Sequence, residues 1–203
     1  KAFVDQNKPK SAVIVGGGFI GLEMAENLRH LGMEVTIVQR PKQLMNPFDS
    51  DMASFIHSEV RKHGVKLMLG HTVEGFAEQD GGVNVLLKDC APLSADMVVL
   101  AIGVTPESTL AKEAGLALGI KGSILVNDRM ETSVPDIYAV GDAVQVKHFV
   151  TEQDTLVALA GPANKQGRIA ADNICGGDSH YLGSQGSSVI KVFDMTAATT
   201  GIN

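Results

Sequence analysis

Three glycines near the start of the chain have the spacing of a turn that binds phosphate groups. Gly16, Gly18 and Gly21 occupy the glycine positions of the pattern G-x-G-x-x-G. The first permits a tight turn, the second lets backbone approach a pyrophosphate, and the third lets helix and strand pack closely. A helix starting here offers free N–H groups and its positive dipole end to an anion. The spacing predicts a dinucleotide site at the N–H groups around Phe19 and Ile20.

The segments on both sides of this turn fit the prediction. Residues 12–15 are an apolar, β-branched run suited to a buried parallel strand. Apolar residues then recur at helical spacing until Gly32, which ends the helix, and 35–38 supplies a second strand. The resulting βαβ unit has about thirty residues, as such units do. An ordinary glycine turn without a ligand is the alternative.

The spacing of apolar residues between 52 and 102 predicts further helices and strands of the same parallel sheet. Apolar residues from 52 to 60 share one helical face, and 65–69 is a third strand. Residues 97–102 form a last apolar strand, which ends at Gly103. An Asp-Gly-Gly turn at 80–82 indicates an antiparallel hairpin inserted before that strand.

We therefore expect an α/β fold. Residues 1–10 are predicted as a connector, and residues 11–118 as a Rossmann-like NAD(P)-binding domain with an antiparallel β excursion.

The remainder holds fewer regular elements. Short strands are expected at 124–126 and 137–140, the second leading into a Gly-Asp pair. Residues 156–174 predict a helix in which Pro162 is tolerable only in the first turn. Residues 188–193 predict a strand with no partner in view.

Composition argues against several partners. Hydrophobic residues make up 44% and charged residues 20% of the chain, as in a globular domain with a packed core. The formal charge is −6 without a basic block, which argues against nucleic acid. No apolar run of about eighteen residues is present, so we expect no membrane partner.

Cysteine and histidine usage predicts neither a disulfide framework nor a metal site. Cys90 and Cys175 are far apart and form no C-x-x-C pair, and the six histidines show no metal-ligand spacing with cysteine or acid partners. Two reduced thiols in a cytoplasmic protein are the favoured interpretation, with a redox pair as the alternative.

The residue expected to select the nucleotide departs from the usual pattern. An acid normally stands about twenty residues after the glycines and binds the 2′-hydroxyl of NAD. Gln39 stands there, followed by Arg40. Glutamine accepts a hydroxyl proton but does not repel a 2′-phosphate, and arginine could pair with one. We favour NAD(H) over NADP(H), taking Arg40 as a solvated loop charge.

Five ordered motifs make the chain similar to a known family. They are V-G-G-G-F-I-G-L-E-M-A-E, M-V-V-L-A-I-G-V-T-P-E, T-S-V-P-D-I-Y-A-V-G-D-A, L-A-G-P-A-N-K-Q-G-R-I-A-A-D-N-I and V-I-K-V-F-D-M-T-A-A-T-T-G-I-N. The chain resembles the flavin-dependent pyridine nucleotide–disulfide oxidoreductases. The last two motifs are similar to the branch with NADH oxidase, NADH peroxidase, coenzyme A–disulfide reductase and persulfide reductase.

The resemblance implies an internal fragment of a longer enzyme. Family members begin with an FAD-binding unit and a redox-active cysteine, and end with a dimer-interface domain. Residues 119–187 would be the second half of the FAD-binding domain, and 188–203 the start of the interface domain. Neither Cys90 nor Cys175 matches the redox cysteine. We expect no catalytic residue here, an inactive fragment on its own, and a homodimer at full length.

The resemblance also implies residues for the nicotinamide. Phe19 stands where the family often has a tyrosine that covers the flavin until nicotinamide displaces it. Glu23 matches a glutamate near the nicotinamide amide, with a first-turn acid favoured by the helix dipole as the alternative. Gly103 matches a glycine that lets the strand end approach the nucleotide.

For FAD, the resemblance implies a second set of residues. Asp142 matches the aspartate that binds the ribitol chain, with Gly141 and Ala143 beside it. A helix beginning near Leu159 and Ala160 would aim its N-terminus at the flavin N1/O2 edge. The alternatives are a plain Gly-Asp turn and a helix that only packs.

The implied function is an FAD-dependent NAD(P)H oxidoreductase. It would pass hydride from NAD(P)H to flavin and on to a disulfide, persulfide, peroxide or dioxygen. The alternative is a stand-alone dinucleotide-binding regulatory module without redox turnover, which would not need the motifs at 141–142 and 159–167. A dehydrogenase acting directly on a small substrate would need an acid/base constellation. None stands at a convincing spacing.

Overall fold

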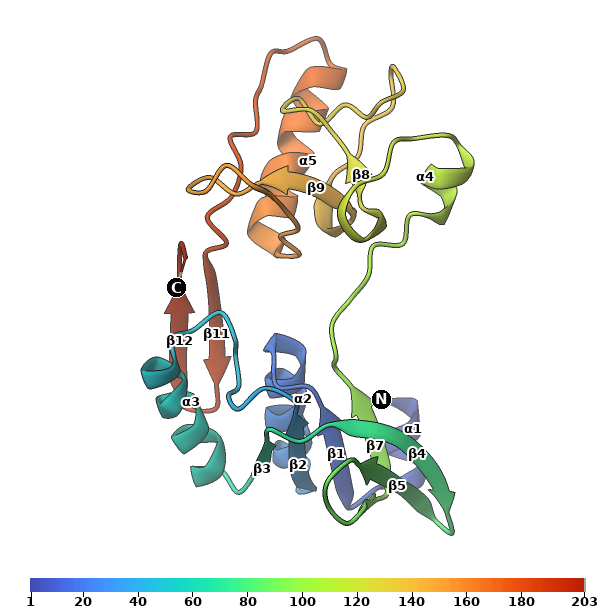
Figure 1. Cartoon of the computed structure of the whole chain (residues 1–203), viewed down its shortest axis with the longest axis vertical. Helices are drawn as coiled ribbons and strands as arrows, with labels where there is room; N and C mark the ends of the chain where they lie inside the picture. The colour runs from blue at the N-terminus through green and yellow to red at the C-terminus, as the bar shows by residue number, and fades with distance from the viewer. Residues whose placement is uncertain (203) are drawn as a thin grey trace. The chain divides into compact units, whose positions relative to one another are not determined.

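The structure is a computed structural model that describes residues 1–202, and it divides into two compact units (Figure 1). The first unit contains residues 1–103 and 189–198, and the second contains 104–188 and 199–202. The helices are α1 (Ala2–Asn7), α2 (Phe19–His30), α3 (Ser50–Lys62), α4 (Thr109–Glu113) and α5 (Ala160–Ile174). The strands are β1 (Ser11–Val15), β2 (Glu34–Gln39), β3 (Lys66–Leu69), β4 (Val73–Gln79), β5 (Gly82–Leu87), β6 (Leu93–Ala95), β7 (Met97–Leu100), β8 (Ile124–Leu125), β9 (Val144–Lys147), β10 (Asp154–Thr155), β11 (Ser188–Val192) and β12 (Met195–Thr199).

A four-stranded parallel sheet forms the centre of the first unit, with the strand order β3-β2-β1-β7. One face packs on α2 and α3 through residues such as Ile14, Leu22 and Ile56. On the other face, Val13 and Val38 join residues of β5 and β6 in a second apolar cluster. The central strands are buried on both faces, which is why they are almost wholly apolar.

The α/β fold predicted for this unit is confirmed, including the inserted hairpin of β4 and β5. Gly32 and Gly64 follow α2 and α3 with φ angles of 84° and 78°, as helix-ending glycines do. The predicted connector contains the short helix α1. The insertion has a third strand, β6, whose three residues are too short for a pattern to predict.

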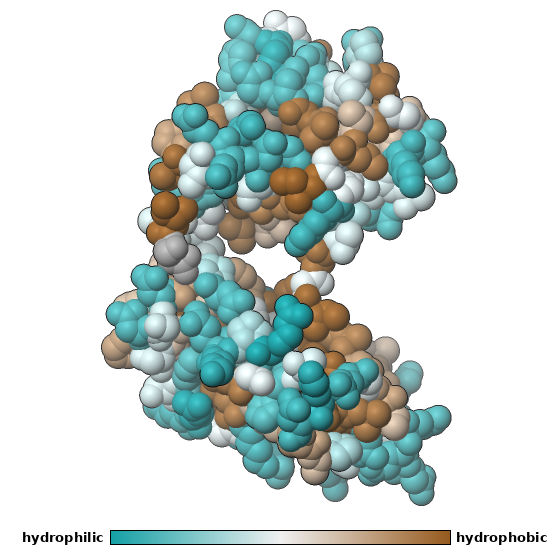
Figure 2. Space-filling view, viewed as in Figure 1, coloured by the Kyte–Doolittle hydropathy of each residue, from teal (hydrophilic) through white to brown (hydrophobic). Residues whose placement is uncertain are grey.

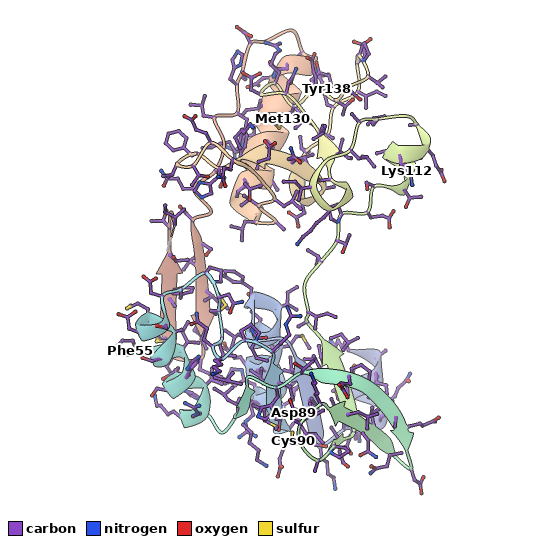
Figure 3. All side chains as sticks on the ribbon, viewed as in Figure 1. Phe55, Asp89, Cys90, Lys112, Met130 and Tyr138 are labelled. Atoms are coloured by element: carbon purple, nitrogen blue, oxygen red, sulfur yellow. The ribbon has the colours of Figure 1, made fainter. Side chains whose placement is uncertain are left out.

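The second unit is built around a three-stranded sheet with the strand order β10-β9-β8 and the helix α5. Its core is a cluster of side chains from the strands, α5 and the loops between them: Met130, Val144, Val146, Ile169, Ala170 and Tyr181. Met130 and Tyr138 lie beside α5 in Figure 3. The predicted helix is confirmed from residue 160 onward, with Pro162 in its first turn.

The strand predicted at 137–140 is wrong. Its only ladder contact within the described residues is an isolated bridge between Glu131 and Tyr138. Met130, next to that bridge, has a φ of 69°, which lies outside the extended conformation of a strand. The strand of this region is instead β9, which directly follows the turn at 141–143.

Two boundaries of the compact units differ from the predicted domain limits. Residues 104–118 group with the second unit, where the Ala117 N–H donates to Ser133 Oγ at 2.8 Å and the Leu125 N–H donates to the Ala117 carbonyl at 3.0 Å. Strand β11 finds its partner in β12, and this pair groups with the first unit, where Phe193 is 3% exposed.

None of the helices in the described part of the chain is long and apolar enough to cross a membrane. Figure 2 shows hydrophilic residues spread over the visible face of each unit.

Candidate dinucleotide-binding site

The glycine turn between β1 and α2 is held by backbone contacts that exclude side chains at two of its positions. A Cβ atom added at Gly16 would lie 2.2 Å from the Ala101 carbonyl oxygen, and the φ of Gly16 is 111°. A Cβ added at Gly21 would lie 2.0 Å from the Gly16 carbonyl oxygen. Both glycines are therefore required for strand, turn and helix to pack this closely.

Gly18, in contrast, faces open space. Among the described residues, no heavy atom beyond its chain neighbours lies within 4 Å of a Cβ added there. Gly18 caps α2, and the first intrahelical hydrogen bond runs from the Leu22 N–H to the Gly18 carbonyl at 3.0 Å. The N–H groups of Phe19 and Ile20 precede that bond and suit an anionic group. This open cradle fits a pyrophosphate.

A buried loop supports the turn from beneath, which the sequence analysis did not predict. The Met45 N–H donates to the Gly17 carbonyl at 2.9 Å, and a Cβ added at Gly17 would lie 2.3 Å from Leu44 Cδ2. Leu44 and Met45 are both 0% exposed. Their signal was an apolar pair in a loop between two regular elements.

His57 of α3 holds this loop in place. Its Nε2 accepts a 3.0 Å hydrogen bond from the Leu44 N–H, so the ring is neutral in this arrangement. Burial, with a contribution from Arg61, lowers the pKa of His57 below its ordinary value. A neutral His57 thus supports the glycine turn through the Leu44–Met45 loop.

Gln39, at the end of β2, is bonded to the turn itself. Its Oε1 accepts a 2.9 Å hydrogen bond from the Gly17 N–H, and its Nε2 donates to the Gln43 carbonyl at 3.3 Å. Arg40 is exposed next to it. The position that commonly carries a ribose-binding acid here holds a neutral amide committed to backbone groups.

The remaining predicted residues of the first unit surround the same sheet edge. Phe19 is half-buried and packs against the core, while Ile20 is 51% exposed. Glu23 is exposed and lies beyond the first turn of α2, so its interpretation as a first-turn acid is wrong. The Ala101 N–H donates to the Val15 carbonyl at 2.8 Å, which brings the segment leading to Gly103 beside the turn.

In the second unit, the turn at 141–143 and the start of α5 lie together. The Gly141 N–H donates to Gln166 Oε1 at 2.7 Å, and Gln166 is 1% exposed. Asp142 is exposed in that turn, and Ala143 is half-buried. Leu159 caps α5, which begins at Ala160. The structural role of Gln166 was missed, although its signal is a polar residue on the apolar face of this helix.

Both cysteines are exposed and, within the described residues, neither is in a disulfide. Cys90 lies beside Asp89 in the loop between β5 and β6 (Figure 3), with its Sγ 3.6 Å from His71 Nδ1.

Known proteins are similar to this chain over most or all of its length. The family model described as pyridine nucleotide-disulphide oxidoreductase matches residues 1–167. The NAD(P)H sulfur oxidoreductase (CoA-dependent) of Pyrococcus abyssi is 36% identical over 203 residues, covering 100% of this chain and 45% of the relative.

Two solved structures are also similar. The reduced CoADR-RHD of Bacillus anthracis is 52% identical with a TM-score of 0.94, and the match covers 100% of this chain and 36% of that one. The NAD-dependent persulfide reductase of A. fulgidus is 37% identical with a TM-score of 0.95, covering 100% of this chain and 38% of that one. The chain spans less than half the length of these relatives. It belongs to the pyridine nucleotide-disulphide oxidoreductase family.

Proposed function

We propose that this chain is the nucleotide-binding part of an FAD-dependent NAD(P)H oxidoreductase. The observation that carries the proposal is the turn in which packing excludes side chains at Gly16 and Gly21 while Gly18 stays open. A turn that only joined a strand to a helix would not need a helix start that is open and has no side-chain cap. An anion is the natural partner of that start.

The first unit would bind the nicotinamide nucleotide, which supplies a hydride when bound. The N–H groups of Phe19 and Ile20 would hold its pyrophosphate. Glu23, exposed one turn further along α2, would bind the nicotinamide amide. Gly103 would let the nucleotide approach the end of the sheet, because it has no side chain that would lie between the strand end and the nucleotide.

Residues 119–187 would form the second half of the FAD-binding domain. Asp142 would bind the ribitol chain, with Gly141 and Ala143 shaping the turn around it. The start of α5, at Leu159 and Ala160, would stabilise negative charge on the flavin. The hydrogen bond from Gly141 to buried Gln166 supports this proposal, since it fixes the turn against that helix.

The nucleotide site would accept both NADH and NADPH, with NADH preferred. A neutral amide at Gln39 does not repel a 2′-phosphate as an acid would. Arg40 is exposed and adjacent, and it offers such a phosphate only a solvated charge.

Electrons would pass to a disulfide, persulfide, peroxide or dioxygen in the complete enzyme. The names of the sulfur oxidoreductase and persulfide reductase relatives favour a sulfur acceptor. The enzyme would be a cytoplasmic homodimer whose interface domain begins near residue 188.

The test is an anaerobic absorption spectrum of the protein produced from the longest reading frame that encodes this chain. We expect a visible flavin absorption band that bleaches when NADH is added. A protein that binds NADH but carries no flavin would overturn the proposal and indicate a regulatory nucleotide-binding module.

A further inference from the structure

Three side chains that could coordinate a metal ion come together at the end of α3, although the sequence predicts no metal site. Glu59 and His63 are one helical turn apart, and Asp194 follows β11. His63 Nε2 lies 3.0 Å from Glu59 Oε1 and 3.2 Å from Asp194 Oδ2. Figure 1 shows α3 beside β11 and β12, which belong to the same compact unit.

The separations between these atoms suit shared coordination. Two ligand atoms that each lie about 2.0–2.1 Å from Zn²⁺ are about 3 Å apart at a right angle, and slightly more at a tetrahedral angle. The distances from His63 Nε2 to Glu59 and to Asp194 both fall in that range. The Glu59 and Asp194 carboxylates lie within 4.8 Å of each other, so all three side chains are close enough to share one small cation.

Contacts with neighbouring groups already orient the three side chains. The His63 ring stacks on Phe193 with centroids 4.2 Å apart and an interplanar angle of 3°, and its Nε2 faces the two carboxylates. Phe193 is buried, and its N–H donates to Glu26 Oε2 at 2.9 Å. The Asp194 N–H donates to Glu59 Oε1 at 3.1 Å. Hydrogen bonds to ligating carboxylates are typical of metal sites and raise their affinity, and the bond from Asp194 N–H to Glu59 is of this kind.

The charges favour a divalent ion. Two carboxylates and a neutral imidazole carry a charge of about −2, and an imidazole nitrogen selects zinc-like ions over Mg²⁺ and Ca²⁺. Lys62 lies 3.5 Å from Glu59 and 3.7 Å from Asp194, and its side chain is 64% exposed. Its long, solvated side chain can leave when a cation binds.

We propose that Glu59, His63 and Asp194 form a binding site for Zn²⁺ or a similar divalent transition-metal ion, with water completing the coordination. The ion joins α3 to the turn between β11 and β12, and so fixes that pair of strands to the first unit. The role is structural, and it is independent of the nucleotide function.

The test is a Co²⁺ titration of the chelator-treated chain, followed by absorption in the visible range and by calorimetry. We expect one equivalent to bind and Zn²⁺ to displace it, with a higher melting temperature in the metal-bound form. His63→Gln and Asp194→Asn should each weaken Co²⁺ binding at least about tenfold.

His30→Gln is the matched control, because His30 also contacts the Phe193 ring, edge-on at 6.1 Å, but lies outside the cluster. It should leave Co²⁺ affinity unchanged. Circular dichroism would establish that the variants are folded. A chain that binds no Co²⁺, or one in which folded His63→Gln binds as tightly as the original, would overturn the proposal and leave a simple ion-pair cluster.

Discussion

The Gly17 N–H donates a 2.9 Å hydrogen bond to the side-chain oxygen of Gln39. This bond joins the end of β2 to the glycine turn after β1, the two places that a dinucleotide would contact at its ribose and its pyrophosphate. Gln39 thus helps to hold the glycine turn, and it stands at the end of β2 where we propose that the ribose binds.

Replacing Gln39 with glutamate should sharpen the preference for NADH. A carboxylate can still accept the Gly17 N–H, although it loses the weaker bond to the Gln43 carbonyl. Its charge repels a 2′-phosphate and weakens NADPH binding about tenfold. Dissociation constants for both nucleotides, measured by calorimetry, check this. Arg40→Ala is the companion variant, and should weaken NADPH binding only slightly. Equal losses for NADH and NADPH in Gln39→Glu would mean that the 2′ position is read elsewhere.

Replacing Gly21 with alanine should destabilise the first unit. The new methyl group would lie 2.0 Å from the Gly16 carbonyl oxygen, a backbone atom that moves only with the turn. We expect a loss of about 1–3 kcal/mol in the free energy of unfolding, measured with urea. Gly167→Ala in α5 is the control, because an added Cβ there meets open space within the described residues. That helical change should stabilise by about 0.5–1 kcal/mol.

Stability of the second unit should depend on pH through His180. The hydrogen bond that His180 Nδ1–H donates to Asp128 Oδ2, 2.8 Å long, is the largest cause of the raised pKa of His180, and Asp178 adds to it. A pKa that is higher in the folded state than in the unfolded state stabilises the folded protein at pH values below the unfolded-state pKa, which is about 6.5. This stabilisation is lost as the pH rises through the folded-state pKa. Below about pH 6, the melting temperature of His180→Gln should therefore be lower than that of the unmodified chain. The difference between the two melting temperatures should decrease at higher pH. A gap that is constant from pH 5 to 9 would contradict this assignment.

Sequence patterns correctly predicted the parts of the fold that are determined by residues close to one another in the sequence. The run at 12–15, the glycines and the apolar spacing of α2 define the βαβ unit without help from distant residues. Strand β9 was missed because Val144–Lys147 is short and takes its strand form from pairing with β8. The pairing of β11 with β12 depends on the turn at Phe193, whose φ of 52° the sequence does not indicate.

Contacts within the candidate sites between residues far apart in the sequence could not be predicted from local patterns either. Gly17 and Gln39 are 22 positions apart, and Glu59 and Asp194 are 135 apart. Each pair meets only after the sheet and its helices have packed. By contrast, Gly16, Gly18 and Gly21 could be predicted because their chemistry lies within one turn of backbone.

The central claim is that the turn around Gly18 binds a pyridine nucleotide, and a calorimetric titration of the purified chain with NADH tests it most directly. We expect saturable binding of one NADH per chain. Gly18→Val should abolish that binding while the melting temperature stays close to the original, because a side chain at Gly18 fills the open cradle and touches little else. Glu78→Val, an exposed change on β4, should bind NADH normally. Unchanged NADH affinity in Gly18→Val, or no binding by the original chain, would contradict the claim.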